Sequence, residues 1–286
     1  MILLDYSQIA LSNIIVQKLN DENMIRHMIL NSIRMYNKRH RAEYGQMVIC
    51  ADGMNTWRRQ YFPEYKAKRR KGKEESTMDW NEIFRIVNLV REEIQANLPY
   101  KVIHIEGCEA DDVIGALAME TQEFGKGEPV MIISSDKDFI QLQRYNNVKQ
   151  WSPIQKKVVT DKNPRTYLFN HIMRGDSGDG IPNVLSKDAT FITEGASQTP
   201  LRQTKVDHWM ENADDLKSHM TEEEYRNYQR NKTLIDLTEI PNAVQQNIIN
   251  TFEGQKLPMK MKVLNYLINK RCTHLIEVVE EFYNVE

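Results

Sequence analysis

The first half of the chain alternates short apolar runs with longer segments of helical periodicity. Four runs are short, rich in branched side chains and bounded by Asp, Gly or Ser, which predicts buried strands. They lie at residues 2–4, 47–51, 102–105 and 130–133. Apolar residues at spacings of three and four predict an amphipathic helix over 22–40 and another after Asp79, which with Glu82 forms a capping-box-like start. This order predicts an α/β fold with a mostly parallel central sheet flanked by helices.

Strand signals stop near residue 165, and the rest of the chain predicts helices. Thr221 and Glu224 have the spacing of a helix cap, and segments 263–268 and 275–282 have apolar periodicity. Residues 186–203 are rich in Gly, Ser, Thr and Pro, so we expect a mobile loop there. We therefore expect two domains. They are an α/β part over 1–165, with an insertion at about 53–78, and a helical part over 166–286.

Composition narrows the class of protein. The 286 residues are 41% hydrophobic and carry a formal net charge of −2, which argues against a protein that simply coats DNA. No stretch approaches the roughly 20 apolar residues of a membrane helix, and Asp5 interrupts the start where a signal peptide needs an apolar core. Cys50, Cys108 and Cys272 lack the spacing of a zinc site or disulfide framework, so we expect buried thiols in the reducing cytoplasm.

Each predicted strand is followed by acidic residues. A single Asp after a strand is ordinarily a helix cap or a turn residue. Four parallel strands, however, open onto one edge of the sheet, where gathered negative charge is unfavourable without a counter-charge. Oxygen ligands with few His or Cys nearby favour magnesium or manganese over zinc. The acids are Asp5, Asp52, Glu109, Asp111, Asp112, Asp136 and Asp138.

A second acidic element runs from Gly175 to Asn183, outside the strand pattern. Its small residues allow sharp turns that would bring Asp176 and Asp179 back to the other acids, although taken alone it would be an exposed Asp/Gly turn. The nine carboxylates together suit two divalent ions roughly 3.5 to 4 Å apart, which activate water and stabilise a leaving oxygen. This pattern is the one expected for phosphodiester hydrolysis.

A basic stretch follows the strand that ends at Asp52. Runs of charge are usually solvated helix faces. Here aromatic residues are interleaved with the cations, and stacking on bases together with cations on phosphates is how single strands are bound. The segment would overhang the metal site, where its cations would stabilise charge in the transition state. Its cations are Arg58, Arg59, Lys66, Lys68, Arg69, Arg70, Lys71 and Lys73, and its aromatic residues are Trp57, Tyr61, Phe62 and Tyr65.

Five motifs in this order resemble the 5′ nucleases of the flap endonuclease superfamily, and within it the ribonuclease H branch of T-even type bacteriophages. The resemblance covers nearly the whole chain. The motifs are Leu4-Asp5-Tyr6-Ser7-Gln8-Ile9-Ala10, Tyr65-Lys66-x-x-Arg69, Glu109-Ala110-Asp111-Asp112, Ser134-Ser135-Asp136-Lys137-Asp138-Phe139 and Gly175-Asp176-x-x-Asp179.

The resemblance implies roles for these residues. Asp5, Asp52, Glu109 and Asp111 would surround one Mg²⁺, Asp136, Asp138 and Asp179 a second, and Asp112 and Asp176 would support through water. Lys66 and Arg69, on an arch or bridge, would lie nearest the scissile phosphate and act in catalysis with Asp111 and Asp138, and Tyr65 would bind nucleic acid with the cations of the stretch. Residues 171–195 resemble a duplex-binding helix-three-turn-helix element, but the chain departs from that pattern with a long loop after Asn183–Asp188.

The implied activity is magnesium-dependent, structure-specific 5′ to 3′ cleavage of RNA/DNA hybrids and of nicked or 5′-flap DNA, leaving 5′ phosphates and removing primers from lagging-strand fragments. Mn²⁺ would substitute for Mg²⁺. The implied partners are a phage single-strand-binding protein and a sliding clamp, with the chain acting as a monomer. Two alternatives remain open. A catalytically silent homologue that grips branched DNA would be expected to have lost some acids. Another magnesium phosphoesterase would not explain the basic insertion or the second acidic element.

Overall fold

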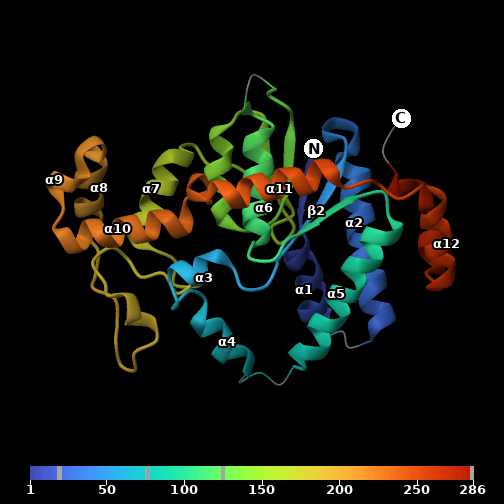
Figure 1. The fold of residues 1–286 in the computed structure, drawn as a ribbon, viewed down its shortest axis with the longest axis horizontal. Coiled ribbons are helices and arrows are strands. Elements are labelled where there is room, and N and C mark those ends of the chain that lie inside the picture. The colour runs from blue at the N-terminus through green and yellow to red at the C-terminus, as the bar shows by residue number, and fades with distance from the viewer. Residues whose placement is uncertain (18–20, 75, 77, 124–125, 284–286) are drawn as a thin grey trace.

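A six-stranded sheet forms the centre of the computed structural model, which describes residues 1–17, 21–74, 76, 78–123 and 126–283 but not the side chains of residues 70, 71, 73 and 74 (Figure 1). The strand order is β3-β2-β1-β4-β5-β6. Neighbouring strands are parallel except that β6 is antiparallel to β5. The strands are β1 (Ile2–Asp5), β2 (Met47–Ala51), β3 (Lys101–His104), β4 (Val130–Ile133), β5 (Val148–Ser152) and β6 (Lys157–Val159).

The four predicted strands and the mostly parallel sheet are confirmed. Strands β1, β2 and β4 are buried along their whole length, as short apolar runs inside a parallel sheet should be. Strands β5 and β6 were not predicted. Strand β5 includes the exposed Lys149 and the buried but polar Gln150, and β6 is short and largely exposed, so neither has a recognisable apolar pattern.

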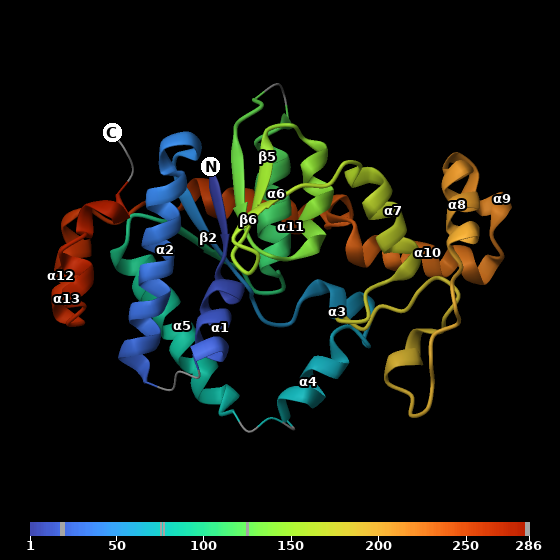
Figure 2. The same cartoon turned by 180° about the vertical axis from the view of Figure 1, so that it is seen from behind.

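Helices cover both faces of the sheet (Figures 1 and 2). Ile2 and Leu4 point into one apolar core, and Leu3 points into the other. The first core is formed with α1 (Tyr6–Gln17), α2 (Glu22–Tyr44), α5 (Trp80–Asn97), α12 (Met261–Asn269) and α13 (Thr273–Ile276). The second is formed with α6 (Ala110–Glu120), the 3-10 segments η2 (Lys137–Arg144) and η5 (Leu237–Glu239), and α11 (Asn242–Gly254).

The predicted helix starts are present at both sites. The Asp79 side chain accepts a hydrogen bond from the backbone N–H of Glu82 at the start of α5. Thr221 and Glu224 form a reciprocal capping box. The segment predicted over 275–282 is interrupted, because α13 ends at Ile276 and a short 3-10 turn, η6 (Val279–Phe282), follows.

Five helical segments from the second half of the chain form a lobe at one end of the molecule, away from α12 (Figure 1). They are α7 (Pro164–Arg174), α8 (Gln203–Glu211), η4 (Ala213–Asp215), α9 (Leu216–His219) and α10 (Glu222–Ile235). Residues 186–202 lack helix and strand apart from the 3-10 turn η3 (Asp188–Phe191), so the predicted loop is confirmed except for Gln203, which begins α8. Its mobility stays a prediction.

The basic stretch forms two short helices, α3 (Trp57–Tyr61) and α4 (Ala67–Glu74), between the sheet and the helical lobe (Figure 2). The three cysteines are free and buried, as expected. Among the described helices, none is long and apolar enough to cross a membrane.

Candidate active site

Carboxylates from three parallel strand ends and the start of α6 line one cavity of about 530 Å³ at the carboxyl edge of the sheet. This is the position in which ligands bind to open parallel sheets. Cationic side chains line the same cavity, so acids and bases share its wall. The charged lining consists of Asp5, Asp52, Arg59, Lys66, Arg69, Glu109, Asp111 and Asp136.

Asp5, at the end of β1, is held by groups from two elements. Its Oδ2 accepts a hydrogen bond from Ser134 Oγ at 2.9 Å, and its Oδ1 accepts one from the backbone N–H of Gln8 at 3.1 Å. Burial, with the nearby negative charge of Asp52, raises the pKa of Asp5 to about 7. The hydrogen bonds therefore fix the orientation of a carboxylate that forms no ion pair with any described residue.

Asp111 and Asp112 are neighbours on α6 but have different environments. Asp111 lines the cavity, and burial together with the charge of Asp136 raises its pKa well above the ordinary value. Asp112 is 0% exposed and does not line the cavity. Its Oδ1 lies 2.7 Å from Arg58 Nη1, and its Oδ2 accepts a hydrogen bond from Trp57 Nε1 at 3.2 Å. Successive helical residues point about 100° apart, and here only the first points into the cavity.

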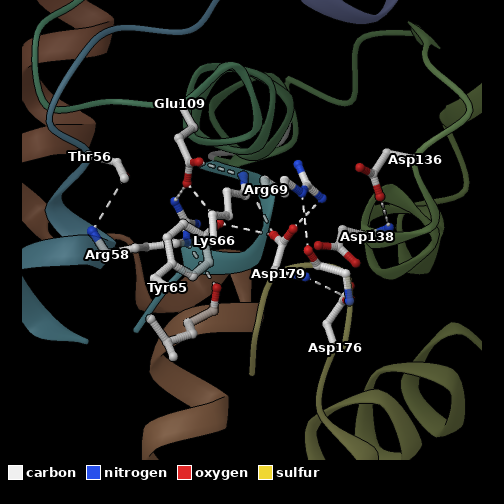
Figure 3. A network of polar contacts seen from close by, with 12 residues as sticks. Thr56, Arg58, Tyr65, Lys66, Arg69, Glu109, Asp136, Asp138, Asp176 and Asp179 are labelled. Atoms are coloured by element: carbon white, nitrogen blue, oxygen red, sulfur yellow. Dashed lines mark hydrogen bonds and ion pairs between the residues drawn. The ribbon is translucent and has the colours of Figure 1, made fainter. Parts of the chain in front are cut away.

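Glu109 lies at the centre of a cationic network (Figure 3). Its Oε1 is 2.6 Å from Lys66 Nζ, and its Oε2 is 3.0 Å from Arg58 Nη1. Burial alone would raise the pKa of Glu109, but the charges of Lys66 and Arg58 lower it below the ordinary value. Tyr65 Oη lies 3.0 Å from Glu109 Oε2 and 3.1 Å from Asp179 Oδ2. Because the hydroxyl has one proton, it donates to one of these two carboxylates at a time.

The first part of the basic stretch is anchored in the protein interior. Phe62 and Tyr65 pack against residues of α7 and α10 in a small apolar cluster. Arg58 is 3% exposed, and its Nε donates to the carbonyl oxygen of Leu234 at 2.9 Å. Arg58 and Tyr65 are therefore buried and contact carboxylates of the site. Their assignment as nucleic-acid contacts stays a prediction.

The backbone also joins this stretch to the Asp/Gly element. The N–H of Lys66 donates to the carbonyl oxygen of Asp179 at 2.7 Å, and Lys66 itself has φ of +56°. Gly180 has φ of +76°, and a Cβ there would lie 3.1 Å from the carbonyl oxygen of Glu64. A glycine is needed at this close approach because both the backbone conformation and the space disfavour a side chain.

This turn places Asp179 on the other side of Lys66 from Glu109 (Figure 3). It forms an ion pair with Arg69, and its Oδ2 is 3.5 Å from Lys66 Nζ. Burial raises the pKa of Asp179 above its ordinary value even though these two cations act to lower it. Lys66 is thus shared between a carboxylate of the α/β part and one of the helical part.

Asp138, Asp176 and His171 form a separate group beside the turn. His171 Nδ1 lies 3.5 Å from Asp138 Oδ1, and its Nε2 lies 3.5 Å from Asp176 Oδ2. The hydrogen bond to His171 lowers the pKa of Asp176 to about 2, whereas burial and the charge of Asp136 raise that of Asp138 to about 7. Sequence analysis missed His171. The available signal was its place one helical turn before Gly175, at the end of an apolar-periodic segment.

The remaining cations of the basic stretch differ in accessibility. Arg59 lines the cavity, and its Nε has no hydrogen-bond partner among the described residues. Lys68 and Arg69 are exposed on α4. The side chains of Arg70, Lys71 and Lys73 lie outside what the structure describes, so these three calls stay predictions.

The donor set fits a hard divalent cation. The cavity offers carboxylate oxygens, which are the ligands that such cations prefer. Burial, and after it the charges of neighbouring carboxylates, raises the pKa values of Asp5 and Asp111. Asp138, His171 and Asp176 offer ligand atoms that all lie within 4.8 Å of one another. Within the described ranges no other group of His, Cys and acidic residues is as tight. Glu109 and Asp179 instead point toward Lys66, Arg58 and Arg69.

Comparison with known proteins agrees with this geometry. A model of the "5'-3' exonuclease, N-terminal resolvase-like domain" family matches residues 6–168, more than half of the chain. The chain belongs to the 5′-3′ exonuclease family. A second family model, "T4 RNase H, C terminal", matches residues 163–282. The resemblance inferred from the five motifs is therefore confirmed.

Individual members of the family match at different lengths. The chain is 36% identical to "Ribonuclease H" of Enterobacteria phage T4, over 98% of this chain and 95% of the relative. It is 30% identical to a "5'-3' exonuclease" of Buchnera aphidicola, over 60% of this chain and 61% of the relative. In fold, it is similar to a zinc-bound T5 5'-exonuclease with a TM-score of 0.62 and 17% identity, over 90% of this chain and 99% of the other. The predicted α/β fold with a helical C-terminal part is thereby confirmed for this 5′ nuclease.

Proposed function

We propose that this protein is a magnesium-dependent, structure-specific 5′ nuclease that acts on RNA/DNA hybrids and on nicked or 5′-flap DNA. The observation that carries the proposal is the convergence of carboxylates from three parallel strand ends on one cavity whose wall also contains Lys66 and Arg69. The names of the relatives support it, since they include a ribonuclease H, a 5′-3′ exonuclease and a flap endonuclease. A T5 flap endonuclease of similar fold has been solved with DNA and metal ions.

The proposed metal ligands are the two sets that the resemblance implies. Asp5, Asp52, Glu109 and Asp111 would hold one ion, and Asp136, Asp138 and Asp179 the second, with Asp176 next to it. Bound Mg²⁺, or Mn²⁺ in its place, would supply an activated water and stabilise the leaving oxygen of the phosphodiester. Asp112 is ion-paired with Arg58 away from the cavity, so we assign it a positioning role for Glu109.

In this proposal the cationic side chains of the cavity also act on the substrate. Lys66 and Arg69 contact Glu109 and Asp179 and also line the cavity, so they lie where a phosphate group would enter. Positive charge held at that position stabilises the charge that develops on a phosphate during cleavage. Tyr65 keeps the two carboxylates oriented by sharing its hydroxyl between them. The Arg59 side chain lines the same cavity and would supply a further positive charge to a phosphate there.

The biological role extends the same proposal. We assign to the nuclease the removal of RNA primers from lagging-strand fragments, leaving 5′ phosphates. The α/β part over 1–165 would carry the chemistry, and the helical part over 166–286 would hold duplex. A single-strand-binding protein and a sliding clamp are the partners that the resemblance implies, and the chain would act as a monomer.

The test uses a 5′-labelled flap duplex and a 5′-labelled RNA/DNA hybrid, each incubated with and without Mg²⁺. We expect short 5′ products only when Mg²⁺ is present. Asp138→Asn should abolish cleavage and leave substrate binding largely unchanged, because one carboxylate charge is removed without changing the shape of the side chain. Asp214→Asn is the matched control, since Asp214 is exposed in η4 and lies outside the site; it should cleave like the wild type.

The outcomes separate the alternatives. Binding of the flap without cleavage under any divalent ion would show a catalytically silent DNA-binding homologue. Phosphate release from small esters without nucleic-acid cleavage would show another phosphoesterase. Full magnesium-dependent cleavage by Asp138→Asn protein purified free of metal would refute the assignment of Asp138 to an ion.

A further inference from the structure

The group of Asp138, His171 and Asp176 differs in chemistry from the large cavity. Its members come from the start of η2, the end of α7 and the turn after α7. Each offers one ligand atom, and these atoms lie within 4.8 Å of one another. The side chains are 19%, 13% and 31% exposed, in that order. Among the described residues that line the large cavity there is no histidine, so this group alone adds a nitrogen to the carboxylate oxygens of the site.

The Asp176 carboxylate is fixed with one oxygen facing His171. Its Oδ1 accepts hydrogen bonds from the backbone N–H groups of Gly178 at 2.7 Å and Asp179 at 3.2 Å. Its Oδ2 lies 3.5 Å from His171 Nε2. One oxygen therefore holds the turn, and the other is directed toward the imidazole.

The His171 ring lies between two carboxylates. Tyr167, one helical turn earlier on α7, packs edge-on against the ring, with the ring centres 5.9 Å apart. Nδ1 lies 3.5 Å from Asp138 Oδ1, the same distance as that between Nε2 and Asp176. Charge-assisted hydrogen bonds between nitrogen and a carboxylate oxygen are shorter, at about 2.7–2.9 Å.

The spacing of 3.5 Å suits two ligands of one ion. Ligand atoms bound at about 2.1 Å lie about 3.0 Å apart at a right angle and about 3.4 Å apart at the tetrahedral angle. Each ring nitrogen of His171 has a carboxylate oxygen at this spacing. The ring is therefore placed to share an ion with the carboxylates, whichever nitrogen binds it.

A second cavity, of about 350 Å³, gives the group a path to solvent. His171 and Asp176 line it together with the cations Lys137 and Arg174, neither of which forms an ion pair with the carboxylates of the group among the described residues. Burial raises the pKa of Asp138 to about 7, and neighbouring carboxylates act in the same direction. The ionised form of Asp138 is thus costly here unless a further cation stabilises it.

An imidazole ligand changes which ions the group favours. Mg²⁺ prefers a shell made of oxygen ligands, whereas imidazole nitrogen suits divalent ions of the first transition row. A set of one nitrogen and two carboxylate oxygens therefore favours such an ion over Mg²⁺, while the carboxylates still allow Mg²⁺ to bind more weakly.

We propose that His171 is a ligand of a divalent transition-metal ion, such as Mn²⁺, which it holds together with Asp138 and Asp176. The inference rests on the proposed function, which assigns Asp138 to the second ion, and it adds to that ion a nitrogen ligand and a preference among metals. If the ring acted only as a cation between two carboxylates, a lysine at position 171 would serve equally well.

The test examines Mn²⁺ bound to metal-free protein without nucleic acid, by pulsed electron paramagnetic resonance. A nitrogen ligand couples to the electron spin of Mn²⁺, and the resulting modulation should change when the protein is made with ¹⁵N-labelled histidine. We expect this modulation in the wild type and not in His171→Lys, because a protonated lysine keeps the positive charge but offers no free electron pair. His274→Lys is the matched control, since His274 is exposed on α13, at the opposite end of the molecule from α7 (Figure 2).

Calorimetric titration with Mn²⁺ and with Mg²⁺ gives a second measurement. His171→Lys should bind Mn²⁺ at this site at least about 10-fold more weakly than the wild type, and its affinity for Mg²⁺ should change by less than about threefold. His274→Lys should match the wild type for both ions. Circular dichroism of the metal-free variants checks that they are folded.

The outcomes are distinct. A wild type without nitrogen modulation at saturating Mn²⁺ overturns the inference, as does a modulation that persists in His171→Lys. Equal Mn²⁺ affinities of the wild type and His171→Lys would show that the ring acts by ion pairing alone, and they would also overturn it. Since no substrate is present, the two proposals fail separately. Modulation in a protein that cleaves neither labelled substrate refutes only the nuclease, and magnesium-dependent cleavage without modulation refutes only the nitrogen ligand.

Discussion

Replacing Arg58 with methionine tests whether this arginine is a structural residue or a nucleic-acid contact. Methionine has a similar length and keeps the volume of the side chain, so the change mainly removes charge and hydrogen bonds. Arg58 is 3% exposed and pairs with Asp112 and Glu109, whose side chains are 0% and 9% exposed. It also donates to the carbonyl oxygen of Leu234. The substitution would leave all three acceptors without their shared donor.

The expected magnitude follows from this burial. Removing one partner of a buried ion pair typically lowers the free energy of unfolding by about 3–5 kcal/mol, because the remaining charge is left without compensation. Glu109 would keep Lys66 and Tyr65, so most of the loss falls on Asp112. The raised pKa of Asp112 should rise further, and the loss of stability should be larger at pH 8 than at pH 5, where Asp112 can take up a proton.

The assay is chemical denaturation of metal-free protein, followed by circular dichroism. Arg58→Met with Asp112→Asn should recover part of the lost stability, since the uncompensated charge is gone. Arg59→Met is the matched control, because Arg59 is the next residue in α3 and lines the cavity. It should change stability by about 0.5 kcal/mol or less. It should also weaken DNA binding. If one phosphate contact is lost, the slope of the logarithm of the DNA-binding constant against the logarithm of the salt concentration should become smaller by about 0.9.

The opposite pattern would refute the reasoning. An Arg58→Met variant with the denaturation midpoint of the wild type and a reduced salt slope of DNA binding would show that Arg58 contacts phosphate. The buried network would also be contradicted if Arg58→Met and Arg59→Met changed the salt dependence of DNA binding equally and had the same free energy of unfolding.

Three further predictions concern the site and its turn. In the absence of divalent ions, the free energy of unfolding should fall by on the order of a few kcal/mol between pH 4 and pH 8. The pKa values of Asp5 and Asp138 are raised to about 7, so the stability that their neutral forms contribute is lost as the pH rises through those values. Thermal melts with and without Mg²⁺ at several pH values check this, and a stability that does not change with pH in the presence of chelator contradicts it. Lys66→Met should lower kcat by roughly 100- to 1,000-fold with a smaller change in KM, measured by single-turnover cleavage; an unchanged kcat would remove Lys66 from the reacting phosphate. Gly175→Ala should unfold the protein or lower its stability by about 3 kcal/mol or more, because a Cβ would lie 2.3 Å from the carbonyl oxygen of Ile181. Gly45 has a similar positive φ but nothing within 4 Å of a Cβ, so Gly45→Ala should lower stability by only about 1–2 kcal/mol. Equal melting temperatures of the two variants would contradict the contact at Gly175.

The fold was largely predictable because the central strands are short, apolar and buried on both faces. The edge was not. Strand β5 is held by pairing with β4 and by Gln150, whose Nε2 donates to the carbonyl oxygens of Ser134 and Asp136. A buried glutamine that bonds to backbone has no apolar signature, so local patterns could not reveal this strand.

The candidate site was predictable in its chemistry and less so in its individual contacts. Acids at the ends of parallel strands must meet, and the structure brings Asp5, Asp52 and Asp136 to one cavity. The sequence of the basic stretch, however, does not indicate which of its charged residues are buried. Arg58 and Arg59 are adjacent in sequence, but one is enclosed by α6 and α10 and the other faces the cavity. That difference depends on tertiary packing, which sequence spacing does not record.

The contacts that shape the candidate site, such as those of Lys66 with Glu109 and Asp179, join segments that are synthesised at different times. Asp5 and Ser134 are 129 residues apart, Arg69 and Asp179 are 110 apart, and Arg58 is completed by a carbonyl 176 residues further along the chain. Contacts of such separation form only after most of the polypeptide has left the ribosome. A growing chain thus has its acids and cations long before it has the arrangement that uses them. The contacts of Lys66 and Arg69 with Asp179 therefore form only once the segment that carries Asp179 has been synthesised and has folded.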